Sequence, residues 1–440
     1  MHKRLIFIFT LGCSAFAAGL PLSPEDILKQ ERPASWPEWV DVEMDESILS
    51  DDALKKSFSE SLTQAPSLFL EVAEGDLFGP SGIYSQEVDG KKERLEVSAK
   101  ATYWHPKKEG FVVNCGIRVH GNRNLLRSPK LNFRLRMGKP SGEGPLAYSL
   151  FSEGIENFQN LLILNPTDDS WTIRKRDGEK AAARYVNDRW ALDTARILGN
   201  HSPRQEWVHV YLNRIYWGVY ALSERPDEHF AAMRRGGTAE DYDVFHAAEI
   251  QSGSDDQRKR VETFLDQEFE NSPESLKQLE ELVDLTAFID HLICQIYQGK
   301  WDWPEQNYFL IGRRKASPRF ALGAWDSESG FYEKSLKGQT SAKDALYFSP
   351  LSSTRFLSDR SGAGFWYRRL IKSPEFRLRF ADHFHHLIAE NGFLSPSRAA
   401  NRYRSLLQEG FKNLREGEQV QYYQEDTETG LQDSDVSIVQ

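Results

Sequence analysis

The sequence predicts an α+β protein, with a strand-rich N-terminal part and a helix-rich C-terminal part. Residues 67–137 contain runs in which apolar and polar residues alternate, which is typical of half-buried strands. Residues 254–298 and the region from 373 onward have the pattern of charged helices. Strands that come first and helices that come later, with one mixed centre, indicate the α+β class.

Four segments of the N-terminal part have a strand pattern: "SLFLEV", "RLEVSAKATYW", "GFVVNCGIRVHG" and "KLNFRLRM". In the fourth segment, alternation places basic and polar side chains on one face, namely Lys130, Asn132, Arg134 and Arg136. Leu131, Phe133 and Leu135 occupy the other face. Two interpretations of the basic face stay open: it supplies a cation to a phosphate, or it is the solvated face of an edge strand.

The centre of the chain combines a helix and a hairpin. The segment 178–200 predicts a helix that ends at Gly199 and Asn200. The following "WVHVYL-NR-IYWGVYALSE" alternates on both sides of a two-residue turn, which predicts a β-hairpin. Trp207 and Trp217 in this hairpin have the aromatic faces that stack on sugars, but core packing is the commoner role of such residues.

The C-terminal part begins with the helices at 254–298, followed by an acidic loop and a further strand over 299–325. The segment "SPEFRLRFADHFHHLIAENG" predicts a helix with Asp382 and His386 on one face. A metal site there is conceivable, but a solvated helix face is favoured because no remote ligand pattern supports a metal. The residues after about 411 are polar and predict a frayed tail.

The N-terminus has the pattern of a cleaved signal peptide over residues 1–17. "MHKR" is basic, "LIFIFTLGCSAFA" is apolar, and Ala15 and Ala17 give the small-x-small pattern before a cleavage site. A buried first helix and a lipid anchor on Cys13 are the weaker alternatives. No later segment is apolar enough to span a bilayer, so we expect a soluble mature chain that is secreted or held in the periplasm or cell envelope.

Net charge, cysteine content and the absence of certain motifs limit the functions that the chain is expected to have. The 440 residues carry a net charge of −10, which argues against nucleic acid as a partner. Cys115 and Cys294 remain after signal cleavage and are able to pair in an oxidising compartment, although two buried free thiols are the commoner arrangement. The chain contains no G-x-S-x-G, H-E-x-x-H or Walker pattern, which leaves hydrolase, zinc-protease and P-loop functions without support.

Three residues have the pattern of a phosphoryl-transfer site. Asp302 and Asn307 in "WDWPEQNYF" have the D-x-x-x-x-N spacing of a kinase catalytic loop. Asp326 follows the apolar strand "FALGAW", where such enzymes place their principal Mg²⁺ ligand. Alone, the pattern is weak, because Asp and Asn are also common turn residues.

The motifs together resemble the CotH family of spore-coat-protein-H-like atypical protein kinases, in particular its exported bacterial members. The matching stretches are "GIRVHGN", "SPKLNFRLRM", "DDSW", "VHVYLNRIYWGVYALSERPDEHF", "EDYDVF", "WDWPEQNYF", "AWDSESGF" and "SPEFRLRFADHF". The resemblance implies a kinase-like fold that binds ATP with Mg²⁺ or Mn²⁺ and phosphorylates a protein substrate at the cell surface or envelope. It divides the chain into a signal peptide (1–17), an N-terminal linker and helical segment (18–65), a kinase-like domain (66–410) and a polar tail (411–440).

Site roles follow from the same resemblance, residue by residue. Asp302 would orient the acceptor hydroxyl, and Asn307 and Asp326 would hold the metal. Lys130 would contact phosphates, and Glu224 would orient or pair with a cation. The family's acidic turn often reads W-D-x-D, whereas here Glu328 replaces the second Asp.

Three functions therefore remain open. The first is an exported protein kinase, and the second is a catalytically inactive surface or envelope scaffold that keeps the fold. The third is a carbohydrate-binding module that uses exposed aromatic residues. The intact trio Asp302, Asn307 and Asp326 favours the first over the second.

Overall fold

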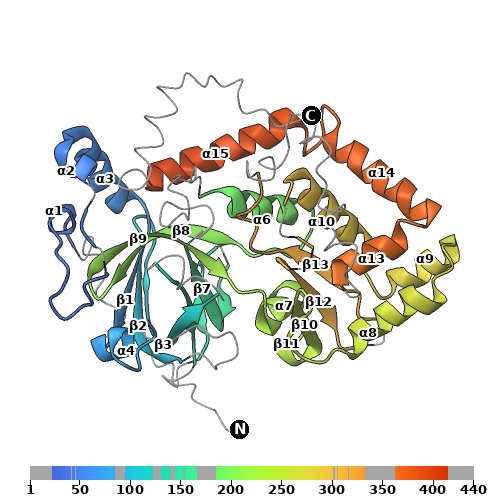
Figure 1. The fold of residues 1–440 in the computed structure, drawn as a ribbon, viewed down its shortest axis with the longest axis horizontal. Helices are drawn as coiled ribbons and strands as arrows, with labels where there is room; N and C mark the ends of the chain where they lie inside the picture. The colour runs from blue at the N-terminus through green and yellow to red at the C-terminus, as the bar shows by residue number, and fades with distance from the viewer. Residues whose placement is uncertain are drawn as a thin grey trace, which may run out of the picture.

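The computed structural model describes residues 22–40, 42–44, 46–84, 95–121, 130–138, 144–151, 154–165, 185–300, 303–304, 306–315, 317–331 and 362–414. Its two larger β-structures lie side by side in Figure 1 with helices above and around them. This arrangement confirms the predicted α+β class.

The first β-structure is a closed barrel with the strand order β1-β2-β3-β4-β7-β9-β8. Its strands are β1 (Ser67–Val72), β2 (Val97–Trp104), β3 (Phe111–His120), β4 (Asn132–Arg136), β7 (Asn160–Leu164), β8 (Gln205–Leu212) and β9 (Ile215–Glu224). The parallel pairing of β1 with β8 closes the barrel, whereas the other neighbours are antiparallel. Closure leaves no free edge among these strands.

Strand β4 is central in the barrel wall, since it pairs with both β3 and β7. Leu131, Phe133 and Leu135 are fully buried in the barrel core, so the predicted alternation is confirmed. The interpretation of the basic face as an edge strand is wrong, because both sides of β4 are hydrogen-bonded.

The segment before the first strand packs on the barrel. Trp36 is buried in the barrel core, where its ring lies 6.0 Å from that of Trp217. Helix α3 (Asp52–Gln64) buries Phe58 against the outer barrel residues Phe69 and Tyr211. Two short helices also belong to this segment, α1 (Pro24–Leu28) and α2 (Glu46–Ser50), and a third, α4 (Glu74–Phe78), follows β1.

The second β-structure is an antiparallel sheet with the order β11-β10-β12-β13. Its strands are β10 (Tyr242–His246), β11 (Glu249–Ser252), β12 (Tyr308–Arg313) and β13 (Ala321–Ala324), and a separate small sheet contains β5 (Leu146–Tyr148) and β6 (Glu156–Phe158). The region 299–325 therefore contains two strands, and the second of them includes most of the predicted apolar strand "FALGAW".

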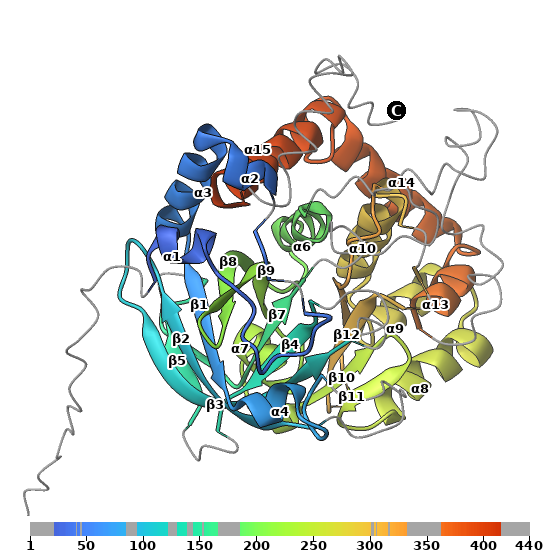
Figure 2. The same cartoon turned by 60° about the vertical axis from the view of Figure 1, so that its left-hand side comes forward.

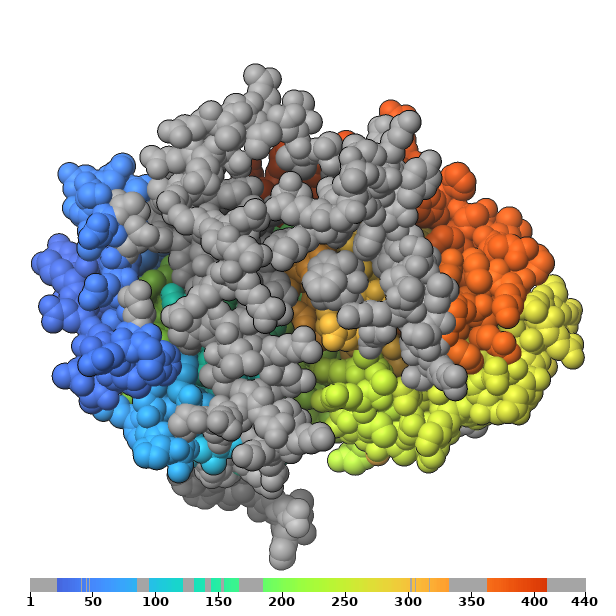
Figure 3. Space-filling view, in the orientation of Figure 1, coloured from blue at the N-terminus to red at the C-terminus, as the bar shows by residue number. Residues whose placement is uncertain are grey.

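The remaining helices lie after the barrel strand β7 in the chain, and most of them pack around the second β-sheet. They are α6 (Asn187–Ile197), α7 (Glu228–Arg235), the 3₁₀ turn η2 (Ala239–Asp241), α8 (Asp256–Thr263), the π-helical turn η3 (Phe264–Glu268), α9 (Pro273–Glu280), α10 (Leu285–Tyr297), α13 (Gly362–Leu370), α14 (Pro374–Ile388) and α15 (Pro396–Leu414). Helix α15 runs back over the barrel side and contacts α3, α6 and β8, as the turned view in Figure 2 shows. In Figure 3 the blue N-terminal residues and the orange residues of α13 and α14 lie on opposite sides of the molecule.

Local predictions around the centre have mixed outcomes. The hairpin of β8 and β9 is confirmed, with Asn213 and Arg214 at φ values of 47° and 69° in its two-residue turn. Two left-handed central residues are the mark of a type I′ turn. The predicted helix over 178–200 begins only at Asn187, because Tyr185 has a φ of 60°; its residues up to 184 lie outside the described ranges.

The burial of two tryptophans and two cysteines decides between the alternative roles that the sequence left open for them. Trp207 and Trp217 are 4% and 2% exposed, so their core-packing role is confirmed and neither offers a face to a sugar. Cys115 and Cys294 are both buried and free, which confirms the free-thiol arrangement.

Candidate active site

Asn307 and Asp326 lie at the same end of the hairpin that β12 and β13 form. Tyr308, the first residue of β12, pairs with Ala324, the last residue of β13. Asn307 directly precedes β12 and Asp326 follows β13 by two positions, so strand pairing brings the two predicted metal ligands to one end of the sheet. Both have a left-handed backbone, with φ values of 68° and 51°, which Asn and Asp tolerate better than other residues with side chains.

A buried lysine joins these two positions. Lys300 is 0% exposed, and its Nζ donates to the backbone oxygens of Asn307 (3.3 Å), Trp325 (2.8 Å) and Asp326 (2.6 Å). A fourth contact runs to Ser327 Oγ at 3.2 Å. The ammonium group thus holds the backbone on both sides of the hairpin end. The sequence pattern did not single out Lys300, although it lies two residues before Asp302.

The N-terminus of α6 holds the turn after Asp326 from another side. Ser327 donates its backbone N–H to Asp188 Oδ1 at 2.7 Å, and Gln205 donates to the other carboxylate oxygen at 2.7 Å. Asn187 donates to the backbone oxygen of Gly330 at 2.9 Å. Burial raises the pKa of Asp188, against the lowering effect of these hydrogen bonds and of the nearby lysine charge. Sequence reasoning missed Asp188, because its partners are far away in the chain.

Trp325 connects the hairpin end to the barrel. Its ring centroid lies 6.2 Å from that of His120 at the end of β3 and 5.3 Å from that of His246 at the end of β10. His120 pairs with Asn132 at the start of β4. Lys130 precedes this strand start by two residues, so it lies at the barrel end that faces Trp325.

Polar side chains on the outer face of β4 are linked by hydrogen bonds to the segment that follows β9. Arg134 Nε donates to Asn160 Oδ1 at 2.8 Å, and the Asn160 amide donates to Asp227 Oδ2 at 2.8 Å. Arg225 Nη1 reaches the same Asp227 oxygen at 3.3 Å. Burial, followed by repulsion from Arg225 and Arg118, lowers the pKa of the Arg134 guanidinium to about 9. Arg134 stays charged at neutral pH, with the further cations Arg118 and Arg225 nearby.

Glu224 lies in a different environment from the other predicted site residues. Its carboxylate accepts hydrogen bonds from Arg204 Nη2 (2.7 Å) and from the Arg204 backbone N–H (2.8 Å), and it also pairs with Arg234. Both arginines also contact Glu156, at 2.6 Å and 3.1 Å. Burial alone would raise the pKa of Glu156, but the two guanidinium groups hold it below its usual range. These contacts give Glu224 a structural role, and its binding to a cofactor stays a prediction.

The donor set at the hairpin end suits a hard divalent cation. A carboxylate and an amide from adjacent turns supply the oxygen atoms that Mg²⁺ prefers. Within the described ranges no group of three or more His, Cys, Asp or Glu side chains gathers as a metal cluster. A two-residue donor set fits Mg²⁺ bound with a nucleotide, because phosphates and waters usually complete its coordination shell. Asp302, the predicted acceptor-orienting residue, lies outside the described residues.

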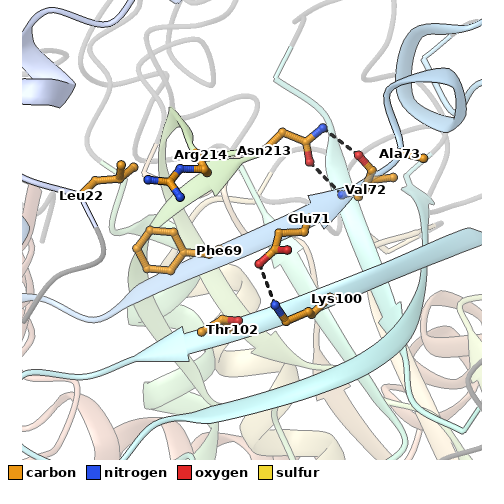
Figure 4. Close-up of a pocket in the computed structure, with 9 residues that line it drawn as sticks. All are labelled: Leu22, Phe69, Glu71, Val72, Ala73, Lys100, Thr102, Asn213 and Arg214. Carbon is orange, nitrogen blue, oxygen red and sulfur yellow. Dashed lines mark hydrogen bonds and ion pairs between the residues drawn. The ribbon is translucent and has the colours of Figure 1, made fainter. Parts of the chain in front are cut away.

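Other candidate sites do not share residues with the hairpin end. A cavity of about 640 Å³ on the outer barrel face is lined by Phe69, Thr102 and the Glu71–Lys100 ion pair, as Figure 4 shows. On α14, Asp382 and His386 are exposed, as the favoured solvated-face interpretation predicted.

Comparisons with known proteins identify the family of the chain. The chain matches the family described as CotH kinase protein over residues 117–436. No curated protein matches the chain. Among solved structures, it is similar to the Helicobacter pylori proinflammatory kinase CtkA at 13% identity, over 74% of this chain and 96% of that one, with a TM-score of 0.23. A TM-score this low supports no conclusion by itself. The family match spans more than half of the sequence and includes Lys130, Glu224, Asn307 and Asp326, and the chain therefore belongs to the CotH kinase family.

Proposed function

We propose that the chain is an exported protein kinase that transfers the ATP γ-phosphate to hydroxyl groups of proteins. The observation that carries the proposal is that the pairing of Tyr308 with Ala324 brings Asn307 and Asp326 to one hairpin end, where Trp325 contacts His120 at the end of β3. Phosphoryl transfer needs mainly positioning and charge stabilisation, and this arrangement supplies both kinds of group.

Each residue has a separate task in this proposal. Asn307 and Asp326 hold the cation, and Lys130 contacts the phosphates from the barrel side. Asp302 orients the acceptor hydroxyl and accepts its proton. Bound Mg²⁺ or Mn²⁺, held by Asn307 and Asp326, would neutralise negative charge on the phosphates during transfer.

A transfer assay tests the proposal. Purified chain from residue 18 onward is incubated with γ-labelled ATP, Mg²⁺ or Mn²⁺ and a protein mixture, with Asp326→Asn as the matched control. We expect label in protein with the wild type and none with the variant. Binding of ATP with metal but no transfer to any protein would favour the inactive scaffold instead.

Export is the second half of the proposal, and it rests on the pattern of residues 1–17. Within the described ranges, no helix is both long and apolar enough to cross a bilayer. The acceptor would then be a protein of the cell surface or envelope. Mass spectrometry of the chain from its native host should find a mature N-terminus near Ala18, and an exported form that retains Met1 would contradict it.

A further inference from the structure

Lys300 stands out because a fully buried ammonium group is expensive unless every donor is satisfied. It follows the end of α10, where Gly299 has a φ of 59° and the Lys300 backbone N–H donates to Gln295 O at 3.3 Å. The backbone of Lys300 is therefore hydrogen-bonded to the C-terminal end of α10, which fixes the origin of its side chain. Lysine offers three donors and no acceptor, which suits a pocket of carbonyl oxygens.

The acceptors of Lys300 belong to the two segments that carry the predicted metal ligands. Asn307 and Asp326 each give a backbone oxygen, and Ser327 gives its hydroxyl. Ser327 is fully buried, whereas Asp326 is exposed. Lys300 therefore binds the buried side of this turn, and the predicted metal ligand Asp326 lies on its exposed side. Phe331, at the far end of this turn, donates to Gln298 O at 2.8 Å, so the end of α10 holds the turn at two points.

We infer that Lys300 is a positioning residue that holds Asn307 and Asp326 at the separation that a divalent cation bound to a nucleotide requires. This inference rests on the proposed function and assigns a residue that the catalytic pattern does not contain. Its effect passes through backbone oxygens, so it needs no contact with substrate. Partners that orient metal ligands typically change metal affinity by about 10- to 100-fold when they are removed.

Two variants separate the ammonium group from the volume of the side chain. Lys300→Met keeps most of the stem but removes the donors. Lys300→Ala removes the stem as well and leaves a slot that matches n-propylammonium. We expect both variants to bind Mn²⁺ about 10- to 100-fold more weakly in the presence of a non-hydrolysable ATP analogue, measured by electron paramagnetic resonance. Added n-propylammonium should restore binding in Lys300→Ala and not in Lys300→Met, where the stem fills the slot.

Hydrogen exchange supplies a readout that does not need a kinase. Peptides spanning 320–331 and 306–311 should exchange faster in Lys300→Met, while barrel peptides such as 205–224 keep the wild-type rate. If the wild type binds no Mn²⁺ with the nucleotide analogue, the proposed function fails, and this local loss of protection still tests the hold of Lys300 on the turn.

Three results would overturn the inference: wild-type Mn²⁺ affinity in Lys300→Met, faster exchange throughout the chain, or equal rescue of both variants by the amine. If neither Lys300 variant folds, Ser327→Ala removes one acceptor and leaves the lysine in place. Unchanged Mn²⁺ affinity together with unchanged exchange at 320–331 in that variant would then refute the role of the lysine cluster.

Discussion

Replacement of Glu224 by Gln should destabilise the protein without weakening nucleotide binding. The carboxylate side chain is 1% exposed, and its two partners Arg204 and Arg234 are 16% and 18% exposed. A Gln side chain turns one acceptor oxygen into an NH₂ donor that faces guanidinium donors. The variant therefore leaves two largely buried cations with one shared anion, Glu156, which is 19% exposed.

The expected magnitude follows from this burial. Removal of one partner from a buried ion pair typically costs about 3–5 kcal/mol, because the remaining charge is left uncompensated. The Glu71–Lys100 pair provides a matched control, since its side chains are 54% and 46% exposed. Exposed pairs contribute about 0.2–1 kcal/mol, so Glu71→Gln should have little effect.

Urea unfolding of both variants measures the difference in free energy of unfolding, and titration with an ATP analogue measures affinity. We expect a large loss of stability in Glu224→Gln only, and wild-type affinity in both variants. A Glu224→Gln protein as stable as Glu71→Gln but with weaker nucleotide binding would refute the structural interpretation and support a cofactor-binding role.

Four further predictions concern the proposed site and the response to pH. Asp326→Asn should fold and melt near the wild type but lose the joint stabilisation by ATP and Mg²⁺, which is about 2.7 kcal/mol at a hundredfold excess over Kd; a full thermal shift would make Asp326 structural. Lys130→Ala should weaken nucleotide binding and leave the core intact, and unchanged affinity by calorimetry would remove its phosphate contact. Asp302→Ala should abolish transfer but retain nucleotide and metal binding, whereas equal loss of both would identify a metal ligand. Burial lowers the pKa of His209 and His246 to about 4, so unfolding in urea should become easier as the pH falls from about 6.5 toward 4, because the unfolded chain takes up protons that the folded chain excludes; a flat profile would contradict this linkage.

Sequence patterns were sufficient where the physical cause is local. The two-residue turn of Asn213 and Arg214 sits between alternating strands, and the alternation of β4 follows from one buried face. The apolar strand "FALGAW" likewise placed Asp326 just after a strand.

Barrel closure was not predictable from these patterns, because it depends on a parallel pairing of β1 with β8 between residues about 140 positions apart. Parallel pairing leaves no turn signal in the sequence. The residues that hold the site in place were also not predictable, because their partners are distant in the sequence. Lys300 and Asp188 differ from ordinary surface charges only through their tertiary partners, the oxygens and the N–H of the 325–327 turn.

The supports of the hairpin end also bear on the choice between a kinase and a scaffold. Asn307 and Asp326 both adopt left-handed backbone conformations, which Asn and Asp tolerate better than other residues with side chains. Lys300 and Asp188 hold the backbone of this turn from its buried side, while the Asp326 side chain is exposed. A cation-binding turn needs its ligand fixed before the cation arrives, and the contacts of Lys300 with the Asp326 backbone oxygen and of Asp188 with the Ser327 N–H provide such fixation.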